Sequence, residues 1–166
     1  MAEKTLDDLF YDTLRDIYYA ERHILKGLKK MMRGAESEEL RAGFEKHYAE
    51  TEGQIERLEQ VFEIIGKPAR GKTCDAINGI LAEGEEILGD YKGTAALDAG
   101  LISSAQAVEH YEIARYGTLK RWAGELGLDK AAALLDATLQ EEYATDDALT
   151  ALADARANVK AMQPAA

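Results

Sequence analysis

Apolar residues recur along the chain every three or four positions, which is the spacing of one face of an α-helix. Five stretches carry this pattern, separated by glycine, proline or residues that favour helix starts. Their predicted ranges are about 5–32, 37–65, 74–88, 94–126 and 129–159. No stretch shows the strict polar–apolar alternation of a β-strand. The pattern predicts an all-α protein, and 166 residues suit a single domain over 1–166.

The segments between the helices predict how the helices connect. Short loops at 33–37 and 126–129 favour two antiparallel helix pairs. The stretch 66–94 is long enough to run the length of a bundle, and it contains the short helix. Two hairpins joined by a long crossover form the ferritin-like variant of the four-helix bundle. Thr5, Ser37, Thr94 and Asp129 are the expected helix N-caps.

Each of the four long helices carries an acid on or beside its apolar stripe. Glu21 interrupts the first stripe, Glu50 borders the second, Glu109 and Glu112 lie on that of 94–126, and Glu142 interrupts the last. A buried carboxylate without a partner is unfavourable, so carboxylates that converge in a bundle need cations among them. The pattern therefore favours a two-metal carboxylate site.

Other interpretations stay open for single residues. A glutamate on an alanine-rich helix is usually solvated, and this applies most to Glu50 at the edge of its stripe. His47, three residues before Glu50, is either a ligand or a core histidine bonded to a carboxylate. For Asp146, one turn after Glu142, three roles stay open: a metal ligand, a residue that hydrogen-bonds to a ligand, or a solvated surface residue.

The remaining polar candidates have weaker claims. Tyr18, Tyr116 and Tyr143 could donate hydrogen bonds to the carboxylates, although core packing is the more common role of tyrosine. Glu83 is a distant supporting candidate, and His23 and His110 are expected at the surface.

Composition narrows the classes of function. Asp and Glu number 31 against 20 Lys and Arg, and the resulting charge of −11, with no basic stripe noted, argues against nucleic acid or anionic membranes as partners. No run approaches the roughly 20 apolar residues of a membrane span, and the N-terminus lacks a secretory apolar core, so a cytoplasmic protein is expected. Cys74 is the only cysteine, which excludes an internal disulfide and a thiolate metal cage.

Four phrases carry a resemblance to a known family over nearly the whole length: YYAER (18–22), HYAETEGQIERLEQVFE (47–63), AQAVEHYEIARYGTL (105–119) and LLDATLQEEYATDDALTALA (134–153). They resemble the YciE/YciF family of small bacterial ferritin-like proteins, which are stress-associated and of unassigned biochemistry. The resemblance implies a ferritin-like bundle, often dimeric, with a rubrerythrin-like di-iron site.

Carried onto this sequence, the resemblance implies as ligands Glu21, Glu50 with His47 beside it, the pair Glu109 and Glu112, and Glu142. Glu50 and Glu112 would bridge the two metals. The usual site has Glu-x-x-His on two helices, whereas here the histidine precedes its glutamate, and Gln54 or Asp146 could substitute. So oxygen-rich a site suits iron, or manganese in its place.

The predicted function is a di-metal protein, with two Fe ions or Mn instead, that reacts with oxygen or peroxide in a stress response. A structural or interaction bundle without catalysis is the alternative, because fold alone does not imply function, and whether the protein is an enzyme stays open. Iron storage in a shell is less favoured, since no pore signature is present. A homodimer is expected, and redox activity would need a separate electron donor because no flavin or rubredoxin segment is found.

Overall fold

The computed structural model describes residues 3–164, which fold into helices connected by short loops and one long crossover. The helices are α1 (Leu6–Gly34), α2 (Glu38–Ile64), α3 (Asp75–Asp90), α4 (Leu97–Glu125) and α5 (Asp129–Leu152), followed by a π-helical turn (Ala153–Ala157) and α6 (Asn158–Ala161). Residues 3–164 contain no β-strand, which confirms the all-α prediction. Residues 1–2 and 165–166 of the predicted domain range lie outside the described part.

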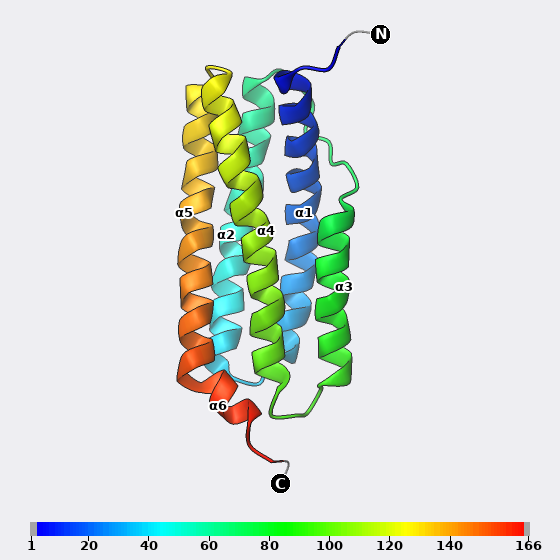
Figure 1. The fold of residues 1–166 in the computed structure, drawn as a ribbon, viewed down its shortest axis with the longest axis vertical. Coiled ribbons are helices and arrows are strands. Elements are labelled where there is room, and N and C mark those ends of the chain that lie inside the picture. Colours follow the sequence, from blue (N-terminus) through cyan, green and yellow to red (C-terminus); the bar gives the residue numbers. More distant parts are fainter. Residues whose placement is uncertain (1–2, 165–166) are drawn as a thin grey trace.

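The four long helices α1, α2, α4 and α5 stand side by side, and α3 lies along the outside against α1 and α4 (Figure 1). The pairs in contact are α1 with α2, α4 with α5, α2 with α5, and α1 with α4. Helices α2 and α4 run in the same direction, so the chain must return along the bundle between them (Figure 1). The crossover with α3 makes this return, which confirms the ferritin-like connectivity.

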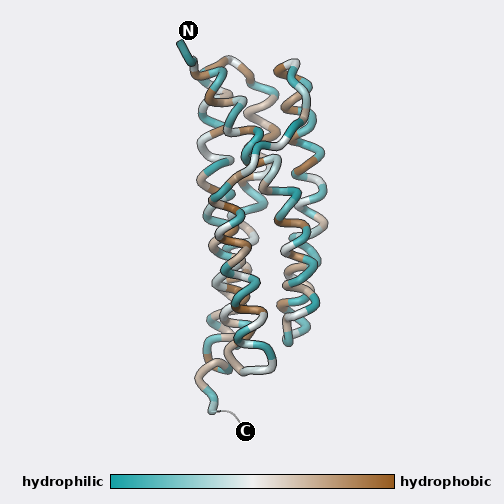
Figure 2. The backbone as a smooth tube through the Cα atoms, turned by 90° about the vertical axis from the view of Figure 1, so that its right-hand side faces the viewer, coloured by the Kyte–Doolittle hydropathy of each residue, from teal (hydrophilic) through white to brown (hydrophobic). Residues whose placement is uncertain are grey.

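Each long helix turns one apolar stripe toward a shared core. Hydrophobic segments recur along every helix with hydrophilic segments between them (Figure 2). Phe10, Phe44, Phe62 and Tyr116 are among the largest fully buried side chains. In α3, by contrast, the described chain buries only Ile77 and Gly84, so α3 is the least anchored of the longer helices.

Helix α3 packs closely because three glycines lie beneath its apolar side chains. Leu81 of α3 lies over Gly27 of α1, where an added Cβ would come within 2.9 Å of Leu81 Cδ2. Leu88 lies over Gly34 in the same way, and a Cβ at Gly100 of α4 would come within 2.7 Å of Ile87 Cγ2. The absence of a side chain at these glycines therefore leaves room for the apolar side chains of α3, which a larger residue at the same position would push away.

The helix ends match the predictions in part. The Ser37 hydroxyl accepts from the Leu40 N–H at 3.0 Å, and the Asp8 carboxylate accepts from the Thr5 N–H at 2.8 Å, as expected of caps. Thr94 does not cap α4: its hydroxyl donates to the Tyr91 carbonyl at 2.8 Å, and α4 begins three residues later. Asp129 is the first residue of α5 rather than its N-cap.

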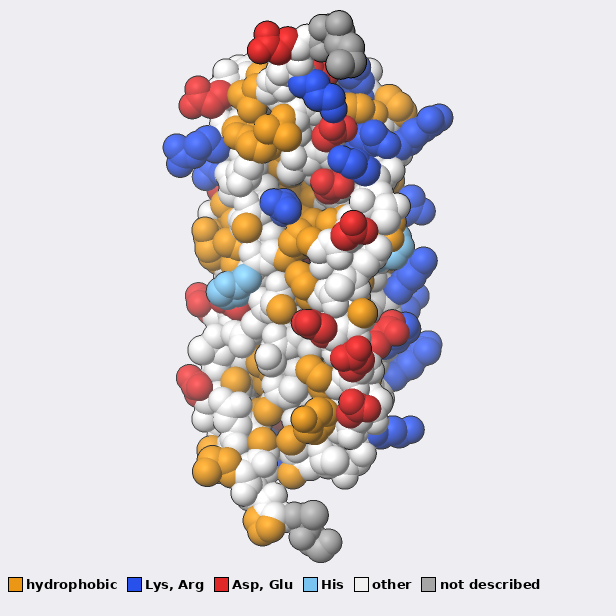
Figure 3. All heavy atoms as spheres, turned by 45° about the vertical axis from the view of Figure 1, so that its right-hand side comes forward, with side chains coloured by type: hydrophobic (Ala, Val, Ile, Leu, Met, Phe, Trp, Pro, Cys, Tyr) orange, Lys and Arg blue, Asp and Glu red, His pale blue; other side chains and the backbone are white. Residues whose placement is uncertain are grey.

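The surface of α1 carries a row of basic side chains, although the sequence was expected to have no basic stripe. Arg22, Lys26, Lys29 and Arg33 are all exposed, and their spacing places them in a row along one face of α1. Figure 3 shows Lys and Arg side chains gathered along one edge of the visible face. The chain therefore has a basic row despite its net charge, and the exclusion of anionic partners stays a prediction. None of the helices in residues 3–164 is long and apolar enough to cross a membrane.

Candidate metal centre

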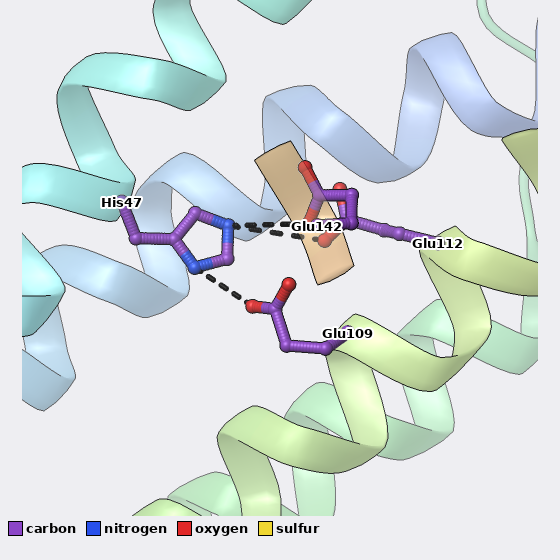
Figure 4. A group of neighbouring side chains, drawn as sticks. All are labelled: His47, Glu109, Glu112 and Glu142. Atoms are coloured by element: carbon purple, nitrogen blue, oxygen red, sulfur yellow. Dashed lines mark ion pairs between the residues drawn. The ribbon is translucent and has the colours of Figure 1, made fainter. Parts of the chain in front are cut away.

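Four side chains from three helices converge in the middle of the bundle. His47 comes from α2, Glu109 and Glu112 from α4, and Glu142 from α5, and they point toward one another (Figure 4). One potential ligand atom from each lies within 4.8 Å of the others. His47 Nδ1 lies 2.7 Å from Glu109 Oε1, and His47 Nε2 lies 3.8 Å from both Glu112 Oε2 and Glu142 Oε2. These distances are short enough for one or two cations to contact all four residues.

Helix α1 adds a fifth side chain to this group. Glu21 is fully buried, and its Oε1 accepts a hydrogen bond from the Tyr116 hydroxyl. Burial raises the pKa of Glu112, and the charges of Glu142 and Glu21 add to that rise, so these carboxyls share one buried environment. We call Glu21, His47, Glu109, Glu112 and Glu142 the inner cluster. All five are at most 2% exposed.

The inner cluster lacks the partners that buried polar atoms need. No hydrogen-bond partner within the described chain reaches the following atoms: both oxygens of Glu109 and of Glu112, Oε2 of Glu21 and of Glu142, and Nε2 of His47. The 2.7 Å contact between His47 and Glu109 is not aligned as a hydrogen bond. Because leaving such atoms unpaired is costly, they require bound protons or cations. Carboxylate oxygens and one imidazole are suitable donors for iron or manganese.

Burial shifts the protonation of the inner cluster. It raises the pKa of Glu21 to about 8, with the Glu142 charge as the next cause. It also raises the pKa of Glu109 and of Glu112 well above 4.5. Burial lowers the pKa of His47, although the carboxylates of Glu142 and Glu50 oppose that shift. Without a cation Glu21, Glu109 and Glu112 therefore retain protons near neutral pH, and the neutral imidazole of His47 keeps a lone pair for a metal.

A chain of hydrogen bonds links Glu142 to the surface between α2 and α5. The buried Gln54 amide donates to Glu142 Oε1 and, at 3.0 Å, to Glu141 Oε2. Arg57 donates hydrogen bonds from both terminal nitrogens to the Glu141 carboxylate, one of them over 2.8 Å to Oε2. The guanidinium also donates to Thr138 Oγ1 at 3.2 Å. This chain fixes the Glu142 carboxylate from behind, as ligands in metal sites commonly require.

Glu50 and Asp146, two predicted ligands, lie outside the inner cluster. The Glu50 side chain is 24% exposed, 3.5 Å from Lys46 Nζ, and accepts from Thr145 Oγ1 at 3.4 Å. The Asp146 side chain is 20% exposed, and its Oδ2 lies 3.1 Å from Nε2 of the exposed His110. Helix α2 therefore contributes His47 and Gln54 to the buried centre rather than Glu50.

The supporting residues also divide. Of the three candidate tyrosines only Tyr116 contacts the inner cluster, because Tyr18 donates to Glu59 at 2.9 Å and Tyr143 is 47% exposed. Glu83 is exposed on α3. His23 stacks on the Tyr19 ring, away from the inner cluster. Sequence reasoning did not find Glu141 and Arg57, whose pairing depends on how α2 approaches α5.

Comparison with known proteins gives consistent matches along the chain. The family model described as "Domain of unknown function (DUF892)" matches residues 5–162. Protein YciF of Escherichia coli (strain K12) is 44% identical over 162 residues, covering 97% of this chain and 98% of YciF.

Two solved structures are also similar. The E. coli stress protein YciF superposes with a TM-score of 0.90 at 43% identity, covering 94% of this chain and 99% of that one. YcfI of Rhodopseudomonas palustris, provisionally described as a structural protein, gives a TM-score of 0.86 at 47% identity, with 89% and 94% covered.

Proposed function

The chain belongs to the DUF892 (YciE/YciF) family, and from this premise we propose that it is a di-metal carboxylate protein of the stress response. Iron is the proposed metal, with manganese as the alternative, and dioxygen or peroxide is the proposed reactant. The single observation that supports this proposal is the set of buried, unpartnered donor atoms in the inner cluster. The stress role follows the description of the related E. coli protein.

The inner cluster supplies the proposed ligands. Glu21, His47, Glu109, Glu112 and Glu142 would hold the two metals, with Gln54 and Tyr116 orienting the carboxylates through hydrogen bonds. Iron held in this way would supply electrons to dioxygen or peroxide. The residues around it exclude water and keep the carboxylates at fixed positions. Glu50 is not needed in this proposed arrangement, because His47 would be the ligand from α2.

Metal analysis of the purified protein tests the proposal. After anaerobic loading with Fe(II) or Mn(II), we expect two ions per chain in the wild type. The double variant Glu109→Gln, Glu142→Gln should lose this binding together with any metal-dependent rise in melting temperature. Glu52→Gln is the matched control, because Glu52 is an exposed acid of α2. Substoichiometric binding of both metals by the wild type would refute a di-metal centre.

Glu50→Gln and Asp146→Asn test the ligand set itself. Both residues lie outside the inner cluster, so we expect each variant to keep the wild-type metal content. A loss of metal as large as in the double variant would mean that Glu50 or Asp146 is a ligand, contrary to its position outside the inner cluster. Light scattering on the same samples tests the proposed homodimer against a larger shell. A separate protein is proposed as the electron donor.

A structural bundle is the second candidate, and the description of the Rhodopseudomonas protein favours it. In that case the carboxyls stay protonated and hold no metal. The double variant would then remain folded or gain stability, since neutral amides replace acids that lack partners. Cells carrying it would behave as the wild type does. The same variant therefore separates the two functions.

A further inference from the structure

A small apolar pocket adjoins the inner cluster on the side that α3 covers. Its volume is about 10 Å³, at the lower limit of the space that one water-sized molecule needs. His47 and Glu109 lie at its inner end. Its remaining walls are the apolar side chains of Ile24, Leu28, Met31, Leu81, Ala105 and Val108. The pocket thus lies between helix α3 and two of the proposed metal ligands.

Leu81 closes the outer end of this pocket. Every other lining residue is at most 4% exposed, whereas Leu81 is half-buried on α3. Leu81 rests on Gly27 of α1, and α3 buries few side chains of its own. Leu81 is therefore the side chain whose rotation we expect to open a path inward.

The chemistry of the pocket selects among small molecules. A buried water needs two to four hydrogen bonds, and hydrogen peroxide needs at least as many. The polar atoms that the pocket offers belong to His47 and Glu109, which are committed to metal if the proposed function holds. An apolar diatomic molecule needs no such partners and gains from apolar walls.

We propose that this pocket, covered by Leu81, is the site where dioxygen approaches the metal centre between His47 and Glu109. The inference rests on the proposed function for its reaction and for the commitment of His47 and Glu109 to metal, and on the apolar walls of the pocket for its binding. It assigns the crossover helix a role in controlling access. It also distinguishes dioxygen from peroxide, which would have to reach the centre by another path.

Dissolved dioxygen is itself the probe, because it is paramagnetic and enhances the relaxation of nearby methyl groups. The metal-free protein is used, so no reaction interferes. We expect stronger enhancement at the Val108 and Ala105 methyls than at Leu135, which is also buried but does not line the pocket. Equal enhancement at Val108 and Leu135 would overturn the proposal.

Two pairs of variants sharpen this test. Ala105→Leu fills the pocket and should abolish the enhancement at Val108, while Ala107→Leu makes the same change on the exposed side of α4 and should not. Leu81→Ala should increase the enhancement, whereas Leu88→Ala, at the same heptad position two turns along α3, should leave it unchanged. The Leu81 pair decides the question if Ala105→Leu is too overpacked to fold.

Kinetics on the Fe(II)-loaded protein separate this inference from the proposed function. Ala105→Leu should slow oxidation by dioxygen and leave both iron content and oxidation by hydrogen peroxide as in the wild type. If the wild type binds no iron, the proposed function fails while the relaxation experiment still decides on the pocket. If iron binds but Val108 shows no enhancement, the pocket inference alone is wrong.

Discussion

Buried carboxyl groups make the stability of the metal-free protein depend on pH. The pKa of Glu21 rises from its ordinary 4.5 to about 8, and the pKa values of Glu109 and Glu112 rise in the same direction. Between pH 4.5 and 8 the folded protein therefore retains protons that the unfolded chain has released. The contribution of these three groups to the free energy of unfolding is greatest below pH 4.5 and falls toward pH 8, by about 1.4 kcal/mol per pH unit for each retained proton. Urea unfolding across this range measures the fall.

Two comparisons accompany the pH series. Glu21→Gln removes one titrating group and should flatten the dependence. Bound metal requires deprotonated ligands, so the stabilisation by metal should grow as the pH rises. A metal-free wild type whose free energy of unfolding increases between pH 4.5 and 8 would contradict the retained protons.

Tyr116→Phe isolates the hydrogen bond that orients Glu21. The Tyr116 ring is fully buried, so phenylalanine keeps the packing and removes only the hydroxyl. Glu21 Oε1 then loses its donor, and we expect a loss of about 1–3 kcal/mol in the free energy of unfolding. Urea unfolding measures it, with Tyr143→Phe at an exposed position as the control. Equal stability of the two variants would mean that the bond contributes nothing.

Single residues show where sequence reasoning succeeds and where it stops. Glu21 lies between Ile17 and Leu25, one turn away on either side, and Glu142 lies between Leu139 and, two turns on, Leu149, so their inward direction could be predicted. Glu50 lies at the edge of the α2 stripe, where a small rotation of the helix decides between core and solvent. The rotation observed favours His47, Thr51 and Gln54, which are all buried. These three residues continue the helical spacing of Leu40, Phe44 and Leu58, so the sequence pattern itself places Glu50 beside the core face.

The packing of α3 against glycines can be tested at the level of the element. Gly100→Ala places a methyl group against Ile87 and should lower the free energy of unfolding by about 1–3 kcal/mol. Gly117→Ala, in the middle of the same helix, meets nothing within 4 Å and should raise it by about 0.5–1 kcal/mol. Thermal or urea unfolding of both variants gives the comparison. Stabilisation by Gly100→Ala would show that α3 moves aside freely.

Helix ends were less predictable than helix centres, for a physical reason. Asp98 of α4 is buried and accepts hydrogen bonds at 2.8 Å from the backbone N–H groups of Glu36 and Ser37. It thereby supports the start of α2 from some 60 residues away. A cap of this kind depends on tertiary contact, whereas Ser37 could be identified because its partner lies three residues on.

The net charge of −11 affects the whole molecule. Repulsion among the excess acids destabilises a compact protein, and salt screens it over about 10 Å at 0.1 M. We expect the melting temperature of the metal-free protein to rise when NaCl is added to about 0.1 M. Differential scanning calorimetry measures this rise. A fall would mean that ion pairs such as Arg57 with Glu141 outweigh the repulsion.

The overall connectivity could be predicted because it follows from loop lengths. Loops of a few residues allow only antiparallel neighbours, and the long stretch after α2 had to return the chain along the bundle. The total charge conceals the basic row on α1, because Arg22 and Lys26 become neighbours of Lys29 only on a helix. Charge balance describes the chain, whereas charge placement needs the fold.

Because α3 lies outside the four long helices, the crossover and the four-helix core can change in sequence independently of each other. Helices α1, α2, α4 and α5 carry all the inner-cluster donors, and the crossover carries none of these residues. A crossover of different sequence, whether it arises in evolution or by design, would therefore leave the donor residues of the inner cluster unchanged. Diversity among relatives should accumulate in this segment first.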